Sequence, residues 1–316
     1  MLINSTTVAL MQCKKYMRQE ISTAVKEICT ALKFNVAPST RVLLKPNLLT
    51  GRSRDHLACT QPEFVAVVAE WFVAQGAVVA IGDSPAFGTA RGVMRTTGIE
   101  QALAGLPVQL LDFDQAIPVT LAGGVQVKVA RATLECDMLI NLPRVKVHSQ
   151  FYMTLAVKNY FGTVVGFQKP AWHLRFGNRE DEFASHLLDL LAMLPSGITF
   201  VDGIIAMHET GPVAGKPFPL GLVAGAFNPV ASDTALLATL GLDLQKSSIW
   251  RECIRRELTG ADLGTLDFPL LTPLTPSEFV SDTFQAPSML KPVSFNPFRM
   301  VLSGCRRFAA RLKESP

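Results

Sequence analysis

Short apolar runs alternate with longer segments of helical periodicity along the first third of the chain. The runs have the length and composition of buried strands, and the longer segments have the 3.6-residue spacing of helices. The strands are expected at 7–13, 41–47, 77–83 and 108–113, and the helices at 18–32, 61–76 and 90–105. Because parallel strands are joined by helical crossovers, this alternation predicts an α/β fold with a mostly parallel sheet and helices on both faces.

The pattern is less regular after residue 113 but remains α/β. A hairpin is expected across Gly123 and Gly124, and a later helix should start at Asn228 and stop at Gly241. Strands are expected at 137–143, 197–203 and 219–226, and helices at about 149–160, at 182–194 and at 228–241.

Prolines accumulate from residue 263 to 297, which predicts an irregular strap over the surface. Residues 296–313 have the pattern of a terminal amphipathic helix. We therefore expect one α/β domain over residues 1–245, with lobes 1–140 and 141–245 as a finer division. The C-terminal part, 246–316, would contain a helix, the strap and a basic tail.

The composition indicates a globular protein without a disulfide framework, a self-contained metal motif or a membrane span. The chain has 316 residues, of which 48% are apolar and 18% charged, so it can bury a large core. Its six cysteines form no C-x-x-C pair and no Cys/His cluster, which indicates neither a disulfide framework nor a self-contained iron–sulfur or zinc site. No apolar stretch reaches the roughly 18 residues of a membrane span and no secretory signal is evident, so we expect a cytoplasmic location.

The positive charge belongs to the C-terminal tail. The net charge is +4, while residues 290–316 contain six basic side chains and one acidic one, 6 − 1 = +5, which leaves −1 for the rest. The tail could contact a membrane surface or an acidic protein, or form a helix packed on the body with solvated arginines. With a slightly acidic body and only three Tyr and three Trp, we expect no nucleic-acid partner.

Polar side chains follow the predicted strands at their carboxyl ends. Lys45, Asp83 and Asp202 each end an apolar run, and Lys146 and His148 follow the run "MLINLPRV". Ligands bind at this edge in open α/β sheets, so we expect these residues to form a binding site for a small anionic molecule.

Two turns extend this site. In "LLKPN", the proline keeps Lys45 out of the helical region, and Asn47 follows it. In "GDSP", Asp83 or Ser84 could cap a following helix or bind a ligand.

The loop "MHETGPVAGKP" contains Gly211 and Gly215, which let backbone N–H groups approach an anion. It lacks the spacing of a nucleotide P-loop, and the chain has neither a G-x-S-x-G elbow nor an H-E-x-x-H pair.

The apolar stretch "NLPRVKVHSQFYMTLAVKNYFG" contains Lys158, and a lysine is costly to bury unless it is neutral or paired. On a helix over 149–160, Thr154 and Lys158 would share a face, with His148 at the start and Asn159 next to Lys158. A buried amine of low pKa serves as a nucleophile or a cofactor anchor. The alternative is a structural pair between Lys158 and Asp202.

His148 and His173 are better functional candidates than His186, because they lie at predicted loop edges, whereas His186 lies within an amphipathic helix and is expected to pack.

Taken in order, "LLKPN", "GDSP", "NLPRVKVHSQFYMTLAVKNYFG", His173, "VDGIIAMHETGPVAGKP" and "NPVASDTALLATLG" resemble the family named domain of unknown function 362, over about residues 5–245. Members of that family are often fused to ferredoxin-type cysteine motifs and described as iron–sulfur proteins. This chain lacks those cysteines.

The order of His148, Lys158 and His173 is also similar to that in the nickel-pincer lactate racemases. The resemblance implies that His148 is a general acid/base, Lys158 the covalent anchor of the cofactor and His173 a metal ligand. We therefore expect an enzyme, an oxidoreductase or an isomerase, that binds a small anion or a cofactor containing a metal such as nickel or iron. The alternative is a non-catalytic accessory protein for iron–sulfur or other metalloprotein maturation.

Overall fold

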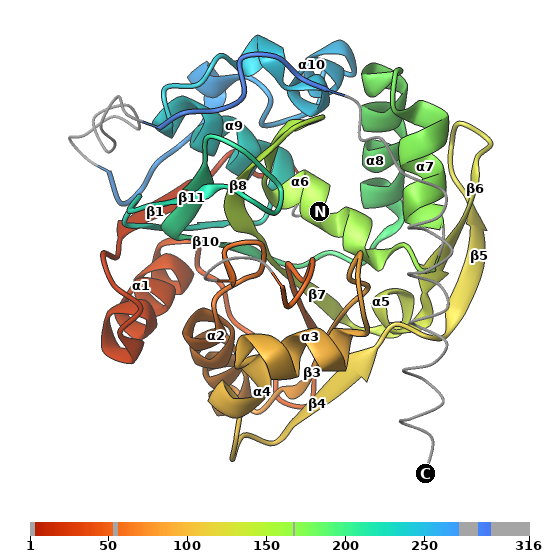
Figure 1. Cartoon of the computed structure of the whole chain (residues 1–316). Helices are drawn as coiled ribbons and strands as arrows, with labels where there is room; N and C mark the ends of the chain where they lie inside the picture. Colours follow the sequence, from red (N-terminus) through yellow and green to blue (C-terminus); the bar gives the residue numbers. More distant parts are fainter. Residues whose placement is uncertain (1–3, 53–55, 167, 272–283, 292–316) are drawn as a thin grey trace.

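A ten-stranded sheet forms the centre of the molecule (Figure 1). The structure is a computed structural model that describes residues 4–52, 56–166, 168–271 and 284–291. Along the main path of the sheet the strands are β1 (Val8–Gln12), β12 (Leu222–Ala226), β10 (Thr199–His208), β7 (Met138–Leu142), β2 (Arg41–Pro46), β3 (Val78–Asp83) and β4 (Val108–Asp112). Strands β8 (Arg144–His148) and β11 (Lys216–Phe218) pair with β10, and β9 (Tyr152–Thr154) pairs with β8. All neighbours from β10 to β4 on the main path are parallel, as the sequence predicted.

Helices cover both faces of the sheet (Figure 1). One face packs against α1 (Arg18–Ala31), α2 (Pro62–Ala74), α3 (Ala90–Thr97) and α4 (Ile99–Ala102). The other face packs against α6 (Ala156–Asn159), the 3₁₀ turn Tyr160–Thr163, α7 (Gln168–Phe176), α8 (Glu180–Met193), α9 (Pro229–Thr239) and α10 (Ser248–Arg255). A separate hairpin, β5 (Ala116–Thr120) and β6 (Gln126–Ala130), and α5 (Arg131–Glu135) lie at the side of the second layer.

Strand β2 shows why the sequence reads as continuous apolar runs. Val42 and Leu44 enter the core under α1 and α2, and Leu43 enters the core on the opposite face. Successive side chains of a strand point to opposite faces, so a strand covered on both sides needs apolar residues at every position.

The direction of the chain through the sheet changes between β2 and β7. From β2 the chain proceeds outward to β3 and β4, whereas β7 lies on the other side of β2 and leads to β10. Loops that leave β2 and β7 at their carboxyl ends therefore diverge. In open α/β sheets this topological switch point is where ligands bind.

The expected helix over 149–160 is wrong. The chain instead makes β8, a tight turn, β9 and then the short helix α6. In the turn, His148 Nδ1 accepts N–H groups of Gln150 (3.0 Å) and Phe151 (3.3 Å), and Tyr152 has a left-handed φ of 68°. A side chain that bonds the nearby backbone offers an alternative to the helix ladder, and this local pairing prevails here.

Two other boundaries differ from the expectation. The segment 90–105 is divided into α3 and α4 at Gly98, whose φ of 88° ends α3. Strand β10 has ten residues, so Asp202 lies inside it and not beyond its end. The other expected strands and helices of the described part are present, and Asn228 caps α9 through the N–H of Val230.

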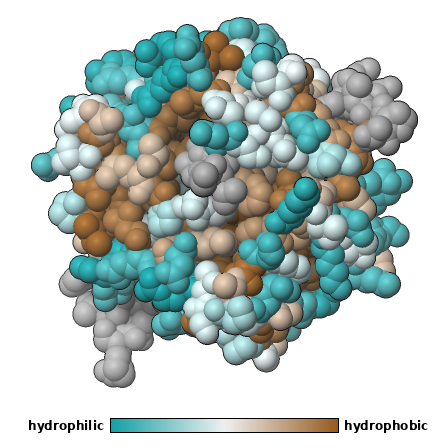
Figure 2. Space-filling model, turned by 180° about the vertical axis from the view of Figure 1, so that it is seen from behind, coloured by the Kyte–Doolittle hydropathy of each residue, from teal (hydrophilic) through white to brown (hydrophobic). Residues whose placement is uncertain are grey.

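The sheet is continuous across residue 140, and the finer division into lobes 1–140 and 141–245 stays a prediction. The terminal helix and the basic tail beyond residue 291 lie outside the described residues. Hydrophilic and hydrophobic areas alternate on the surface seen from behind (Figure 2), and no helix in the described part is long and apolar enough to cross a membrane.

Candidate active site at the switch point

Three asparagines connect the strands that diverge at the switch point. The Asn159 amide nitrogen donates to Asn141 Oδ1 at 2.8 Å, which joins α6 to β7. The Asn159 carbonyl oxygen accepts from Asn47 Nδ2 at 2.6 Å, which joins α6 to the loop after β2. Because these amides satisfy one another, they join the strands by polar contacts that add no charge.

Lys45 and Asp83 form a buried ion pair beside these amides. Lys45 Nζ lies 2.9 Å from Asp83 Oδ1, and the second carboxylate oxygen accepts the N–H of Leu48 at 2.8 Å. Burial lowers the pKa of Lys45, and the Asp83 charge opposes that shift. Gly162 packs directly on the pair, where a Cβ would collide with both charged groups.

Lys146 lies on β8 and reaches Asn47 at the same switch point. Its amine donates to Asn47 Oδ1 and, at 2.7 Å, to the carbonyl of Ala58. Burial lowers its pKa to about 8. No carboxylate of the described residues is within ion-pair distance of this amine.

Lys158 on α6 lies among aromatic rings. Its Nζ is 4.2 Å from the ring centre of Phe161, 4.8 Å from Phe151 and 5.6 Å from Phe183. No hydrogen bond or ion pair to Lys158 Nζ is formed within the described part of the chain. Burial, and secondarily the charges of neighbouring lysines, hold the pKa of Lys158 well below its usual range.

His148 and His173 lie next to this amine. Their rings are parallel, 7° between planes, with centres 6.2 Å apart, and both contact Phe151. His173 Nδ1 is 2.7 Å from Gln150 Oε1. Burial, followed by the charge of Lys158, holds the pKa of each histidine well below its usual value, so both imidazoles are neutral at pH 7.

The histidines were also candidates for a metal site. Within the described ranges, no three side chains of His, Cys, Asp or Glu come together in a way that could hold a metal ion. The assignment of His173 as a metal ligand stays a prediction.

Helix α7 brings a further lysine over the site. Lys169 donates to the carbonyl of Ser84, which connects α7 to the turn after β3. Ser84, Asn47 and His173 are half-buried and border the buried lysines.

The geometry suits a negatively charged molecule. Lys45, Lys146 and Lys158 converge from β2, β8 and α6, and Asp83 is the carboxylate that pairs with one of them. A site with neutral imidazoles beside an amine of low pKa can also accept and return protons.

The family model for the domain of unknown function DUF362 matches residues 42–238, more than half of the chain. A thylakoid-associated protein from Synechocystis sp. is 34% identical over 284 residues, which cover 89% of this chain and 87% of that protein. The chain belongs to the DUF362 family. The resemblance found in the sequence motifs is thus confirmed.

Two solved structures share a smaller part of the fold of this DUF362 member. One is a crystal structure of a protein from Thermotoga maritima, with a TM-score of 0.45 and 10% identity over 66% of this chain. The other is the lactate racemase apoprotein from Thermoanaerobacterium thermosaccharolyticum, with a TM-score of 0.44 and 11% identity over 70% of this chain. The match covers only 56% and 54% of those chains, and at these TM-scores it supports no functional conclusion.

The carboxylate of Asp202 is bonded to other elements of this DUF362 protein, and its role in ligand binding stays a prediction. Its carboxylate accepts from Tyr16 Oη at 2.7 Å and from the N–H of Gln61 at 3.0 Å. The alternative of a pair between Lys158 and Asp202 is therefore wrong. Asp202 instead fixes the start of α2, and the buried Arg144 guanidinium, 5.8 Å from the Tyr16 ring centre, completes this cluster.

Thr154, Gly211 and Gly215 were also expected at the site. Thr154 lies on β9 opposite Lys146, so it does not share a helix face with Lys158. The two glycines do permit close backbone approach, but to carbonyl groups of this chain: Gly211 packs on Val147 and Gly215 on Thr210. Their role in anion binding stays a prediction.

Several residues of the DUF362 site were missed. Lys169 and Phe183 lie in the later helices α7 and α8, and no periodic pattern of the sequence connects them to Lys158. Asn141 was visible as a polar residue near the carboxyl end of the strand "MLINL", two residues before Pro143, and this position was the available signal. The helix after the "GDSP" turn is capped by Thr89, so neither Asp83 nor Ser84 has the capping role.

We expect Asp83→Asn to destabilise the protein by about 3–5 kcal/mol, because it leaves the Lys45 ammonium buried without a counter-charge. Urea unfolding at pH 7 measures the change. Asp112→Asn is the matched control, since Asp112 aligns with Asp83 on β4 but is half-exposed, and its loss should cost less than about 1 kcal/mol. Equal losses in the two variants would contradict a buried pair.

Proposed function

We propose that this DUF362 protein is an enzyme that binds a small anionic ligand or cofactor at the switch point, between Lys45, Lys146 and Lys158. The proposal rests on one observation: of these three buried amines, only Lys45 has an ion-pair partner among the described residues. Buried charges are normally paired, so a bound anion would supply the missing negative charge.

Binding would couple to protonation of Lys158. Its pKa is low in the phenyl cage formed by Phe151, Phe161 and Phe183, and a nearby anion favours the ammonium form. The anion is therefore expected to bind together with a proton. As a neutral amine, Lys158 could instead form a covalent bond to an electrophilic cofactor.

His148 is the proposed general acid/base. Its Nδ1 accepts backbone N–H groups, so in the neutral ring Nε2 carries the proton and would donate a hydrogen bond to a ligand. His148 would take up a proton, as a general base, at Nδ1 when that nitrogen releases the N–H groups of the turn. Proton transfer at a small anion suits an isomerase or an oxidoreductase. A metal-containing cofactor with nickel or iron would supply the redox step.

Replacing Lys158 by Met should abolish anion binding and leave the melting temperature at or above the wild-type value, because an apolar chain of similar volume fits the phenyl cage better than an amine. Isothermal titration calorimetry with inorganic phosphate, sulfate and two- to four-carbon carboxylates tests binding, and calorimetric melting tests stability.

Lys128→Met, at an exposed position of β6, is the matched control for the loss of one positive charge. A large loss of stability in Lys158→Met with binding retained would make Lys158 a structural residue and overturn the proposal.

The affinity for an anion should fall more steeply with pH above about 8, where Lys146 loses its proton in addition to the proton that Lys158 takes up on binding. If only the ammonium form of Lys146 binds, this further decline approaches tenfold per pH unit. The same shift affects stability in the opposite direction: the unfolded chain keeps this proton to about pH 10.5, so between pH 8 and 10.5 the contribution of Lys146 to the free energy of unfolding rises with pH. Titrations from pH 6.5 to 9.5 measure both, and an affinity whose decline grows no steeper up to pH 9.5 would exclude Lys146 from the site.

We further propose that the basic segment 292–316 contacts an anionic surface. The relative from Synechocystis sp. is called thylakoid-associated, and the segment contains five basic and one acidic residue. A cytoplasmic location with reversible membrane attachment is consistent with both.

Deletion of 292–316 should therefore abolish cosedimentation with vesicles containing anionic lipid and leave anion binding at the switch point unchanged. Vesicles of neutral lipid are the control. If the shortened protein still binds both vesicles and anions but loses a partner protein in pull-downs, the accessory-protein alternative gains support.

A further inference from the structure

A buried carboxylate of α9 holds the start of α6. Asp233 Oδ1 accepts the N–H of Ala156 at 2.7 Å, and Oδ2 accepts the N–H of Val157 at 3.1 Å. The next two residues of the chain are Lys158 and Asn159, whose side chains are part of the candidate site. Two hydrogen bonds thus join the Asp233 carboxylate directly to α6, the helix that orients Lys158 and Asn159.

Helix α6 has only four residues and cannot hold its own conformation. A first turn of helix is costly to form, and its first N–H groups have no partners within the helix. The preceding residue, Leu155, provides no side-chain cap. Asp233 supplies these partners from a different helix, 77 residues further along the chain.

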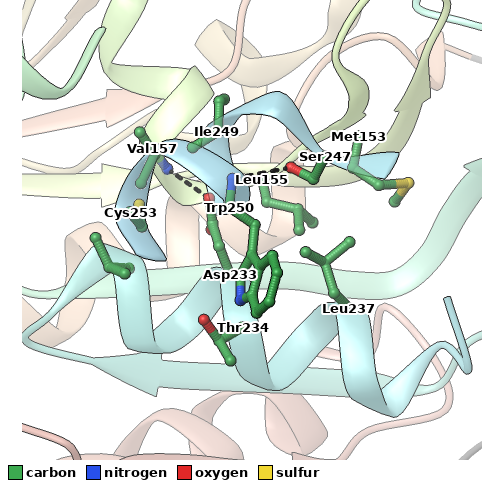
Figure 3. A pocket seen from close by; sticks show the side chains of 11 residues that line it. Met153, Leu155, Val157, Asp233, Thr234, Leu237, Ser247, Ile249, Trp250 and Cys253 are labelled. Atoms are coloured by element: carbon green, nitrogen blue, oxygen red, sulfur yellow. Dashed lines mark hydrogen bonds between the residues drawn. The ribbon is translucent and has the colours of Figure 1, made fainter. Parts of the chain in front are cut away.

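Packing on this side of α6 is incomplete. A cavity of about 10 Å³, enough for one water molecule, lies between α6, α9 and α10, and Asp233, Thr234 and Val157 are among its lining residues (Figure 3). The buried hydroxyl of Thr234 has no hydrogen-bond partner in the described part of the protein. On this side of α6, the two hydrogen bonds of Asp233 are the polar contacts that join the helix to α9.

The electrostatics agree with this role. Burial raises the pKa of Asp233 to about 7, and the two backbone N–H groups oppose the shift. The hydrogen bonds that hold α6 are the interactions that stabilise the charge of Asp233.

We infer that Asp233 is a positioning residue of the candidate active site: through the N–H groups of Ala156 and Val157 it fixes α6 so that the Lys158 amine stays inside the phenyl cage and the Asn159 amide stays at the switch point. The inference deepens the proposed function, on which its relevance to ligand binding rests, but the effect on Lys158 can be measured without any ligand.

The test is Asp233→Asn in the full chain labelled with [ε-¹³C]lysine. Asn can accept only one of the two N–H groups and presents an NH₂ group to the other. The pH titration of the Lys158 ¹³Cε resonance, assigned by its absence in Lys158→Met, reports the environment of the amine. We expect the pKa of Lys158 to rise by about one unit or more, since release of α6 moves the amine toward water.

The direction of the change in the Lys158 pKa distinguishes a positioning role of Asp233 from a direct effect of its charge. Removal of a negative charge can only lower the pKa of a nearby lysine, so a rise supports release from the cage. An unchanged or lower pKa would overturn the inference. Asn228→Ala is the matched control, because it removes a buried cap of the same helix, to Val230 and Thr259, without touching α6, and should lower stability with no change at Lys158.

Two further measurements keep the outcomes distinct. In the wild-type protein, the amides of Ala156 and Val157 should exchange with deuterium as slowly as those of α9, and exchange at the rate of an open loop would overturn the inference even if Asp233→Asn fails to fold. Titration with inorganic phosphate should show weaker binding by about tenfold in Asp233→Asn. A shifted Lys158 resonance in a protein that binds no phosphate, even as wild type, would support the positioning role and count against the proposed function.

Discussion

The ion pair between Lys45 and Asp83 is the interaction on which the site depends. An ammonium group at the carboxyl end of β2, with no exposed surface, is tolerated because one carboxylate lies 2.9 Å away and is itself bonded to the backbone. Gly162 lets the chain after α6 pass directly over the pair. Because Asp83 neutralises the charge of Lys45, the electrostatic repulsion that Lys146 and Lys158 meet at the switch point is smaller.

These two lysines meet the constraint in different ways. Lys146 keeps hydrogen bonds to Asn47 and Ala58, and its pKa falls to about 8. The Lys158 amine forms no hydrogen bond in the described part of the chain and instead faces phenyl rings. Burial holds its pKa well below the usual range. The neighbouring imidazoles are neutral for the same reason. Buried amines and imidazoles with lowered pKa values thus lie close together at the switch point, and perturbed pKa values of this kind are common in active sites.

The fold connects these groups to the rest of the molecule through few contacts. The amides of Asn47, Asn141 and Asn159 join the two halves of the sheet where the strand order reverses. On the far side of α6, Asp233 joins the helix to α9. Helix α6 is therefore held on one side by the asparagine amides and on the other by the Asp233 carboxylate, and the position of Lys158 depends on both sets of hydrogen bonds.

Local sequence patterns were sufficient for most of the framework. Apolar runs and helical spacing predicted the parallel strands and their crossovers, because burial on both faces demands apolar residues whatever the neighbours are. They also predicted that Lys45, Asp83, Lys146 and His148 would meet at one edge. The expected helix at 149–160 failed because the imidazole of His148 bonds the backbone of the turn, which a periodicity argument does not register.

What the sequence by itself determined is the α/β class, the family and the set of polar residues at the carboxyl edge, since these follow from short-range patterns. Only the tertiary structure decided which of them pair. Asp202 faces Tyr16 and Gln61 instead of Lys158, the phenyl cage draws on Phe183 from α8, and α6 is held by Asp233 from α9. Each of these contacts joins segments far apart in the chain, and their geometry is set by the packing of helices on the sheet, for which no local pattern of residues provides a signal.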